Sequence, residues 1–180
     1  ALPKRGLALL LAAAALSACR GKQEEPAPGR AAASWPSKPD IVLVTIDTLR
    51  ADALGFAGNA RVATPVLDRL AGQGTAFENA HAQNVVTLPS HANILTGLYP
   101  YQHGIRDNSG FRLAPSTPTV ASLLKARGYA TGAFVGAFPL DSRFGLVRGF
   151  DVYDDNYGSQ GPTDMVFVER KAEVVVAAAL

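Results

Sequence analysis

The sequence predicts an α/β layered fold in which helices pack against a mostly parallel sheet. The continuous apolar and β-branched run at residues 41–46 is typical of a buried central strand in such a sheet. A second strand pattern occupies residues 129–135, and helical patterns alternate with these strands along the chain. This alternation favours the α/β class over an all-helical or all-β fold.

Prolines, glycines and hydroxyl side chains predict where the other elements begin and end. Thr64-Pro65 and Pro89 mark helix starts, because proline is tolerated in a first turn. In chain order we expect a helix from Pro65 to between Gly72 and Gly74, a short strand at 75–77, a helix from Pro89 to Gly97, a loop from Tyr99 to Pro115, a helix from Thr117-Pro118 to Gly128, a loop from Phe138 to Gly161 and a helix from Thr163 to Leu180. The last helix stops without a terminator, so we expect an N-terminal fragment of a larger domain.

Residues 1–19 are expected to be a targeting segment rather than part of the fold. Lys4 and Arg5 precede an apolar run that is shorter than the ~20 residues of a membrane span. The segment ends in Leu16-Ser17-Ala18-Cys19, which resembles a bacterial lipobox and implies that Cys19 is lipidated. The alternative is an ordinary cleaved signal peptide in which the cysteine is incidental.

The predicted organisation is therefore a lipoprotein signal peptide at 1–19, a disordered tether at 20–38 and a catalytic part at 39–180. The tether contains prolines, glutamates and small residues without a hydrophobic period. We expect the protein to be lipid-anchored in the bacterial cell envelope, outside the cytoplasm, with the membrane as a partner through this anchor.

Composition excludes several classes of protein. The 180 residues are 48% hydrophobic and 18% charged, which is a globular composition. The 17 Lys and Arg nearly balance the 15 Asp and Glu, so nothing indicates a nucleic-acid partner. Cys19 is the only cysteine, which excludes an internal disulfide and a thiolate metal cluster.

Residues 87–97 carry the strongest indication of chemistry. Thr87 places a hydroxyl directly before the Pro89 helix start, where a nucleophile and free backbone N–H groups would meet at one point. An anionic ester could be bound and attacked there. The alternative is that Thr87 is simply a helix cap.

Asp47, at the carboxyl end of the strand at 41–46, is the candidate metal ligand. Open α/β sheets bind ligands at that edge, and a threonine hydroxyl needs a base or a metal to become a nucleophilic alkoxide. His91, one turn into the helix, would donate to a substrate oxygen or to the alkoxide. The alternatives are a turn or helix cap for Asp47 and an ordinary helix-face residue for His91. Arg50 and Asp52 are expected to form a surface or second-layer pair.

A polar cluster at residues 103–108 follows the helix. His103 or Arg106 could contact the charge of a bound anion in a pocket that this loop lines. The alternative is a solvated turn built on Asp107-Asn108.

Together these motifs resemble the N-terminal part of a sulfatase, within the alkaline-phosphatase-like superfamily. The resemblance runs in order from about Pro39 to Tyr129. It rests on Asp40-Ile41-Val42-Leu43-Val44-Thr45-Ile46-Asp47, Thr64-Pro65, Leu67-Asp68, Leu70-Ala71, Gly74, Phe77, Leu88-Pro89-Ser90, Leu95-Thr96-Gly97, Tyr99-Pro100 and His103-Gly104.

The resemblance implies a three-layer α/β/α fold with one or two divalent cations at the strand ends. It favours calcium, with zinc or manganese as alternatives. Asp47 matches the first metal-binding aspartate, Thr87 the nucleophile position and metal contact, and His103 a histidine of the family's loop pattern. The remaining ligands would follow residue 180. Phe150-Asp151-Val152-Tyr153 resembles a structural or substrate-side loop of the family. The aspartates of this stretch are therefore not expected to be those ligands: Asp151, Asp154, Asp155 and Asp164.

Three departures from the resemblance bear on the chemistry. Sulfatases convert cysteine or serine at the nucleophile position to formylglycine, which Thr87 cannot form. The family's supporting arginine is His91 here, and its second aspartate is Thr48. We therefore expect no formylglycine. The pattern is similar to superfamily branches in which a threonine alkoxide on a metal attacks phosphorus.

The sequence thus predicts a metal-dependent hydrolase of sulfate or phosphate esters, with Thr87, His91 and His103 catalytic and an anionic ester as substrate. Phosphorus is favoured, because a sulfo-threonine would have no easy exit. The alternatives are a transferase that moves a phosphate-bearing headgroup to an envelope glycan, and a non-catalytic binding module. The fragment alone is expected to be inactive.

Overall fold

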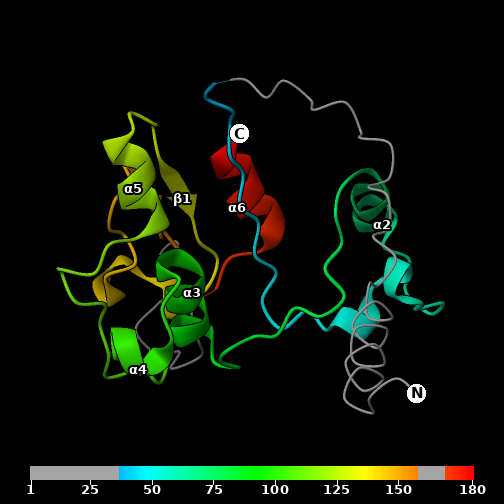
Figure 1. Cartoon of the computed structure of the whole chain (residues 1–180), viewed down its shortest axis with the longest axis horizontal. Helices are drawn as coiled ribbons and strands as arrows, with labels where there is room; N and C mark the ends of the chain where they lie inside the picture. The colour runs from blue at the N-terminus through cyan, green and yellow to red at the C-terminus, as the bar shows by residue number, and fades with distance from the viewer. Residues whose placement is uncertain (1–36, 158–168) are drawn as a thin grey trace, which may run out of the picture. The chain divides into compact units, whose positions relative to one another are not determined.

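The computed structural model describes residues 37–157 and 169–180 (Figure 1). The chain divides into two parts, Ala1–Thr45 and Ile46–Leu180. Of the first part only residues 37–45 are described, and they form neither helix nor strand. The predicted signal peptide and nearly all of the predicted tether lie outside the described residues. Within the described part of the chain, no helix is long and apolar enough to span a bilayer.

The predicted strand at 41–46 is wrong for this structure. The run forms neither helix nor strand, and Val42 and Val44 are 85% and 73% exposed. A buried central strand needs hydrogen-bonded neighbours on both sides and helices over both faces. The only sheet among the described residues has two strands, both later in the chain, and neither pairs with this run. The predicted strand at 75–77 is also wrong, because that segment is irregular and Phe77 is 80% exposed.

The sheet is formed by β1 (Gly132–Phe134) and β2 (Val152–Asp154), which pair in parallel. Gly132 lies opposite Val152, and the Val135 N–H extends the ladder by donating to the Asp154 carbonyl. β1 lies inside the predicted strand at 129–135. β2 falls in the loop predicted from Phe138 to Gly161, a stretch rich in glycine, aspartate and aromatic residues.

The predicted helices form, with altered bounds. They are α2 (Pro65–Gln73), α3 (Thr87–Thr96), α5 (Val120–Ala126) and α6 (Ala172–Ala179). α4 (Pro100–His103) arises inside a predicted loop, and short 3₁₀ turns cover Ala51–Ala53, Gly55–Ala57, Phe138–Leu140 and Ser142–Phe144. Residues 163–168 of the predicted last helix lie outside the described residues.

α5 begins later than predicted because Thr119, not Thr117, is its cap. The Thr119 hydroxyl accepts the Ser122 N–H, and the Ser122 hydroxyl accepts the Thr119 N–H in return. This reciprocal pair satisfies two groups that an isolated helix start leaves unpaired. The helix end at Ala126 precedes Gly128, whose positive φ of 78° accommodates the turn.

α3 lies at the centre of the hydrophobic core. Figure 1 shows it beside α4 and α5, and it also packs on the 3₁₀ turn at Phe138–Leu140. Leu88 and Ala92 on α3 are fully buried, and burying a side chain of leucine size contributes about 1.5–3 kcal/mol. The core cluster consists of Leu88, Ala92, Ile105, Leu113, Leu140, Phe144 and Leu146. The helix that carries Thr87 is therefore anchored in the core through Leu88 and Ala92.

Candidate active site

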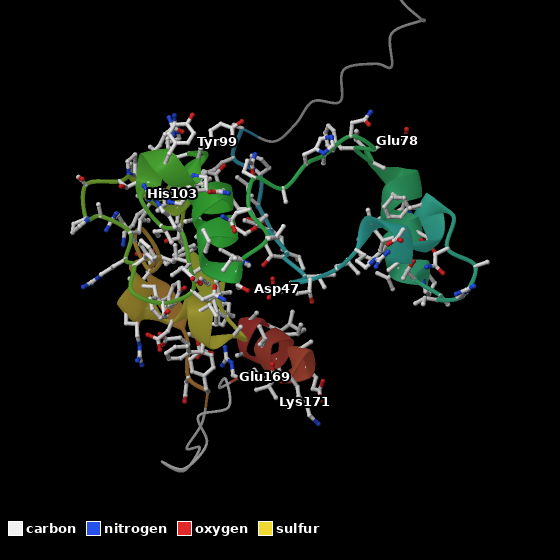
Figure 2. The ribbon with its side chains drawn as sticks, turned by 90° about the horizontal axis from the view of Figure 1, so that it is seen from below. Asp47, Glu78, Tyr99, His103, Glu169 and Lys171 are labelled. Atoms are coloured by element: carbon white, nitrogen blue, oxygen red, sulfur yellow. The ribbon has the colours of Figure 1, made fainter. Side chains whose placement is uncertain are left out.

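The structure brings Asp47 and Thr87 together across 40 residues of sequence. The Thr87 hydroxyl Oγ1 donates to the Asp47 carboxylate Oδ2 at 3.1 Å. Figure 2 labels Asp47 at one end of the α3 ribbon, which is the end where Thr87 begins the helix. The Asp47 side chain is exposed and Thr87 is half-buried, so the pair faces a region that a ligand can reach.

A tight turn aims Asp47 at the helix. Asp47 and Thr48 are its central residues, and the Leu49 N–H points back to the Ile46 carbonyl at 3.5 Å. Thr48 has a φ of +56°. This left-handed conformation is strained for a β-branched side chain, and such strain concentrates at functional sites.

The start of α3 offers fewer N–H groups to an anion than the sequence predicted. Thr87 is the first helical residue rather than the cap, and Val86 occupies the cap position. The Leu88 N–H donates to Asn108 Oδ1 at 2.8 Å, and the Ser90 N–H donates to the Val86 carbonyl at 3.0 Å. Pro89 has no N–H. The prediction of several free backbone N–H groups is therefore wrong. Among the first four residues of α3, Leu88, Pro89 and Ser90 have no N–H available to bind an anion.

His91 lies next to Thr87 but contacts its backbone. The His91 Nδ1 lies 2.8 Å from the Thr87 carbonyl oxygen, so we assign the proton to Nδ1. The contact fixes the imidazole over the first turn of α3. The structure thus brings together Asp47, Thr87 and His91, while the catalytic role of His91 stays a prediction.

His103 lies elsewhere, buried between α3 and α4. Its Nε2 is 2.6 Å from the Asn93 side-chain amide, and its Nδ1 accepts the Ile105 N–H at 3.1 Å. Burial lowers the pKa of the imidazole below its ordinary value. Asn93 is six residues beyond Thr87, which corresponds to about 9 Å along a helix, and Figure 2 labels His103 away from Asp47. The contacts of His103 join the two helices, and its predicted catalytic role stays untested.

The sequence offered two alternatives for the loop after His103, a pocket for an anion or a solvated turn, and the structure has features that bear on each. Arg106 is exposed, and Asp107 Oδ1 accepts the Asn108 N–H at 2.7 Å, as in a solvated turn. Asn108 nevertheless reaches the start of α3 through its contact with Leu88. Sequence reasoning missed this residue, because an Asp-Asn pair is the ordinary composition of a turn.

The aspartates of the second half have structural contacts. Lys125 Nζ lies 2.6 Å from Asp151 Oδ1, Arg170 Nη1 lies 3.0 Å from Asp154 Oδ2, and Asp155 Oδ2 accepts the Ser142 N–H at 2.8 Å. These contacts give all three aspartates structural partners, and the prediction that this loop does not supply the metal ligands stays a prediction. Asp164 lies outside the described residues. Arg50 and Asp52 form the expected exposed pair at 2.5 Å.

The comparisons with known proteins place these motifs in a family. The sulfatase family model matches residues 39–172. The chain belongs to the sulfatase family. Over 99 residues it is 41% identical to an N-acetylgalactosamine-6-O-sulfatase of Bacteroides thetaiotaomicron, a match that covers 53% of this chain and 19% of that protein. It is also 38% identical over 126 residues to the steryl-sulfatase of Mus musculus, covering 64% of this chain and 20% of that protein.

A solved structure confirms the fold class. A 2-O GAG sulfatase matches with a TM-score of 0.53 and 28% identity, covering 66% of this chain and 25% of that one. The α/β fold of the alkaline-phosphatase-like superfamily is therefore the fold of this chain. The chain spans about a fifth to a quarter of the length of these relatives.

Sulfatases generally depend on a divalent cation, and the oxygen donors of this site fit one in part. A carboxylate and a hydroxyl oxygen are the donor types that calcium and magnesium prefer. Among residues 37–157 and 169–180, no group of three His, Cys, Asp or Glu side chains could hold an ion. Asp47 and Thr87 thus supply two donors, compared with the six to eight that calcium takes.

Proposed function

We propose that this protein is a metal-dependent ester hydrolase in which Thr87 is the nucleophile and Asp47 a ligand of the cation. The observation that carries the proposal is the 3.1 Å contact between Thr87 Oγ1 and Asp47 Oδ2. Family membership supports sulfate-ester hydrolysis at the level of the family. The acceptor atom in this protein, sulfur or phosphorus, belongs to the proposal.

The described residues account for the orientation of the nucleophile. Asp47 accepts the hydroxyl hydrogen and thereby aims the Oγ1 lone pairs away from the carboxylate. A divalent cation, when bound, makes such a hydroxyl more acidic and withdraws charge from the oxygens of the ester. The Nδ1–H of His91 is directed at the Thr87 carbonyl, so the ring could donate to a substrate oxygen through Nε2 only as the imidazolium.

Phosphodiesters are the substrate class that we favour. Thr87 Oγ1 would bond to phosphorus as the ester's alcohol leaves, and water would then release the phosphomonoester and restore the hydroxyl. With a sulfate ester the same route ends in a stable sulfo-threonine, and Thr87 cannot form the formylglycine that avoids this outcome. The names of the relatives support sulfate esters instead, so the experiment must compare both.

The test measures turnover of an aryl sulfate and an aryl phosphodiester by the full-length protein with calcium, zinc or manganese added. We expect phosphodiester turnover, and a loss of kcat of about a thousandfold or more in Thr87→Ala, because a missing nucleophile removes the covalent route. Ser90→Ala is the matched control. It removes a hydroxyl from the same half-buried helical turn and should leave kcat near that of the unsubstituted protein.

Two outcomes would contradict parts of the proposal. Efficient aryl sulfate turnover with Thr87 unmodified by mass spectrometry would refute the preference for phosphorus. Unchanged activity or phenotype in Thr87→Ala would favour a binding module. Product analysis with a phospholipid donor separates hydrolysis from headgroup transfer, since only transfer gives a phosphorylated glycan.

We further propose that the protein is anchored in the bacterial cell envelope by a lipid on Cys19. The lipobox-like Leu16-Ser17-Ala18-Cys19 supports this, and so does the composition of residues 20–38 as a tether. An anchored hydrolase would meet substrates outside the cytoplasm.

A further inference from the structure

The contact between Asn108 and Leu88 joins a loop to the start of the nucleophile helix. Asn108 Oδ1 accepts the Leu88 N–H at 2.8 Å, across 20 residues of sequence. Leu88 is the second residue of α3 and directly follows Thr87. The peptide plane that Asn108 holds is therefore the one that joins Thr87 to Leu88.

The Leu88 N–H depends on Asn108 because the first turn of a helix offers this group no backbone acceptor within the helix. The residue at the cap position, Val86, has no polar side chain that could accept an N–H. Leu88 is fully buried, so its N–H would lose water without a replacement if Asn108 were absent. Asn84 Oδ1 accepts the Val86 N–H at 2.7 Å, which organises the chain before the helix but not the helix itself.

The loop that presents Asn108 is itself held by the core. Ile105 precedes Asn108, Leu113 follows it, and both are fully buried in the cluster that contains Leu88. The Leu113 N–H donates to the Phe144 carbonyl at 2.9 Å, and the Asn108 N–H donates to Asp107 Oδ1 at 2.7 Å. Both ends of the Asn108–Leu88 hydrogen bond are therefore fixed to one packed core, which resists small displacements.

We propose that Asn108 is a positioning residue for the Thr87 nucleophile, acting through the Leu88 N–H. This inference rests on the proposed function of Thr87. Asp47 fixes the hydroxyl from one side, and Asn108 fixes the backbone that carries it. Loss of the Asn108 contact lets the first turn of α3 shift, and displacements of about 1 Å at a reacting group can lower rates about a hundredfold.

The experiment compares three variants of the full-length protein on the ester that it turns over best. Asn108→Ala should lower kcat by about ten- to a hundredfold and change KM far less, because ground-state binding is largely retained. Asn108→Asp keeps an oxygen that accepts the Leu88 N–H, so it should restore most of kcat. Its added charge should instead raise KM for an anionic ester.

Asn59→Ala is the matched control. Asn59 is half-buried like Asn108, and its Oδ1 accepts the N–H groups of Arg61 and Val62, at 2.8 and 3.1 Å, in a turn before α2. This substitution should lower thermal stability but not kcat. Hydrogen exchange followed by mass spectrometry supplies a readout apart from activity: the peptide spanning 86–90 should exchange faster in Asn108→Ala only.

The outcomes separate this inference from the proposed function. If Thr87→Ala abolishes turnover while Asn108→Ala behaves like Asn59→Ala, the positioning role is refuted and the nucleophile stands. A rise in KM at unchanged kcat in Asn108→Ala would also refute positioning, because it would assign Asn108 to substrate binding. If Thr87→Ala remains fully active, the proposed function fails, whatever the Asn108 variants do.

Discussion

At the scale of single residues, the candidate site is a set of contacts between residues distant in sequence. Asp47 meets Thr87, and Asn108 meets Leu88. Asp47 and Thr87 could be selected from the sequence, because strand-end carboxylates and hydroxyls at helix starts are chemically distinctive. Asn108 could not, because its local sequence fits an ordinary turn and only packing reveals its partner.

His103 illustrates the opposite case. The sequence singled it out as a candidate for catalysis or anion binding, since a histidine in a polar loop commonly has such a role. The structure places the imidazole in the core, against Asn93 and the Ile105 N–H. Burial depends on neighbours from both helices, which local sequence does not record.

Thr48 leads to a prediction about stability. Its φ of +56° is unfavourable for a β-branched residue, whereas asparagine tolerates this conformation. Thr48→Asn in the full-length protein should therefore raise the free energy of unfolding by about 1 kcal/mol, measured by urea denaturation. Thr75→Asn is the control, because Thr75 is exposed and does not have a positive φ. A decrease in stability for Thr48→Asn would show that the threonine side chain makes contacts that outweigh the strain.

At the scale of elements, Asp151 ties the end of α5 to the starts of both strands. Its Oδ1 pairs with Lys125 Nζ on α5, and its Oδ2 accepts the N–H and hydroxyl of Thr131, which directly precedes β1. The hydrogen bond from Lys125 and those from Thr131 lower the pKa of Asp151 from 3.8 to about 2. The ionised carboxylate is therefore favoured in the folded state.

This shift predicts how the contribution of Asp151 depends on pH. A carboxylate with a lowered folded-state pKa stabilises the protein above the unfolded value of 3.8, and the contribution is lost as pH falls toward about 2. Asp151→Asn should therefore lower the Tm at pH 7, and the gap from the unsubstituted protein should narrow below about pH 3.8. Lys125→Met should also make the Tm less dependent on pH in this range, because it removes the largest cause of the lowered pKa of Asp151. A gap in Tm that stays constant from pH 7 to pH 3 would contradict this assignment.

The elements themselves were predicted unevenly. The helices at 65–73, 87–96 and 120–126 could be found, because prolines, glycines and hydroxyl caps act locally. β2 was missed because three residues give too short a pattern to recognise, and the strand forms only by pairing with β1. α4 was missed for a related reason, since a single turn has no detectable period.

At the scale of the whole molecule, the apolar run at 41–46 shows the limit of a local pattern. The run has the composition of a central strand, yet its side chains are exposed and no described strand pairs with it. Strand formation requires backbone partners on a neighbouring segment, and this chain spans about a fifth to a quarter of the length of its relatives. The composition of the run therefore indicates that it is suited to a strand, but it does not identify the segment with which that strand would pair.

The proposed lipid anchor is a prediction at the same scale. Cys19→Ser should move the full-length protein from the membrane fraction to the soluble fraction of a bacterial host. The acyl group on the cysteine contributes about 0.8 kcal/mol of membrane-binding free energy per buried CH₂, and serine cannot carry it in the same way. Labelled palmitate should enter the unsubstituted protein and not the variant. Ser17→Ala is the control, because alanine retains a small residue before the cysteine. Unchanged membrane retention in Cys19→Ser would refute anchoring through this residue.

The sequence by itself determined the family, the fold class, the helix positions and the two residues most suited to the proposed chemistry. These depend on motif order and on caps, prolines and glycines, whose effects reach only a few residues along the chain. Only the tertiary structure decided that Asp47 meets Thr87, that Asn108 holds the start of α3 and that His103 is buried. Those contacts join segments 10 to 40 residues apart. Their geometry depends on how distant segments meet, in part through the core that holds Leu88 and Ile105, and local preference does not record it.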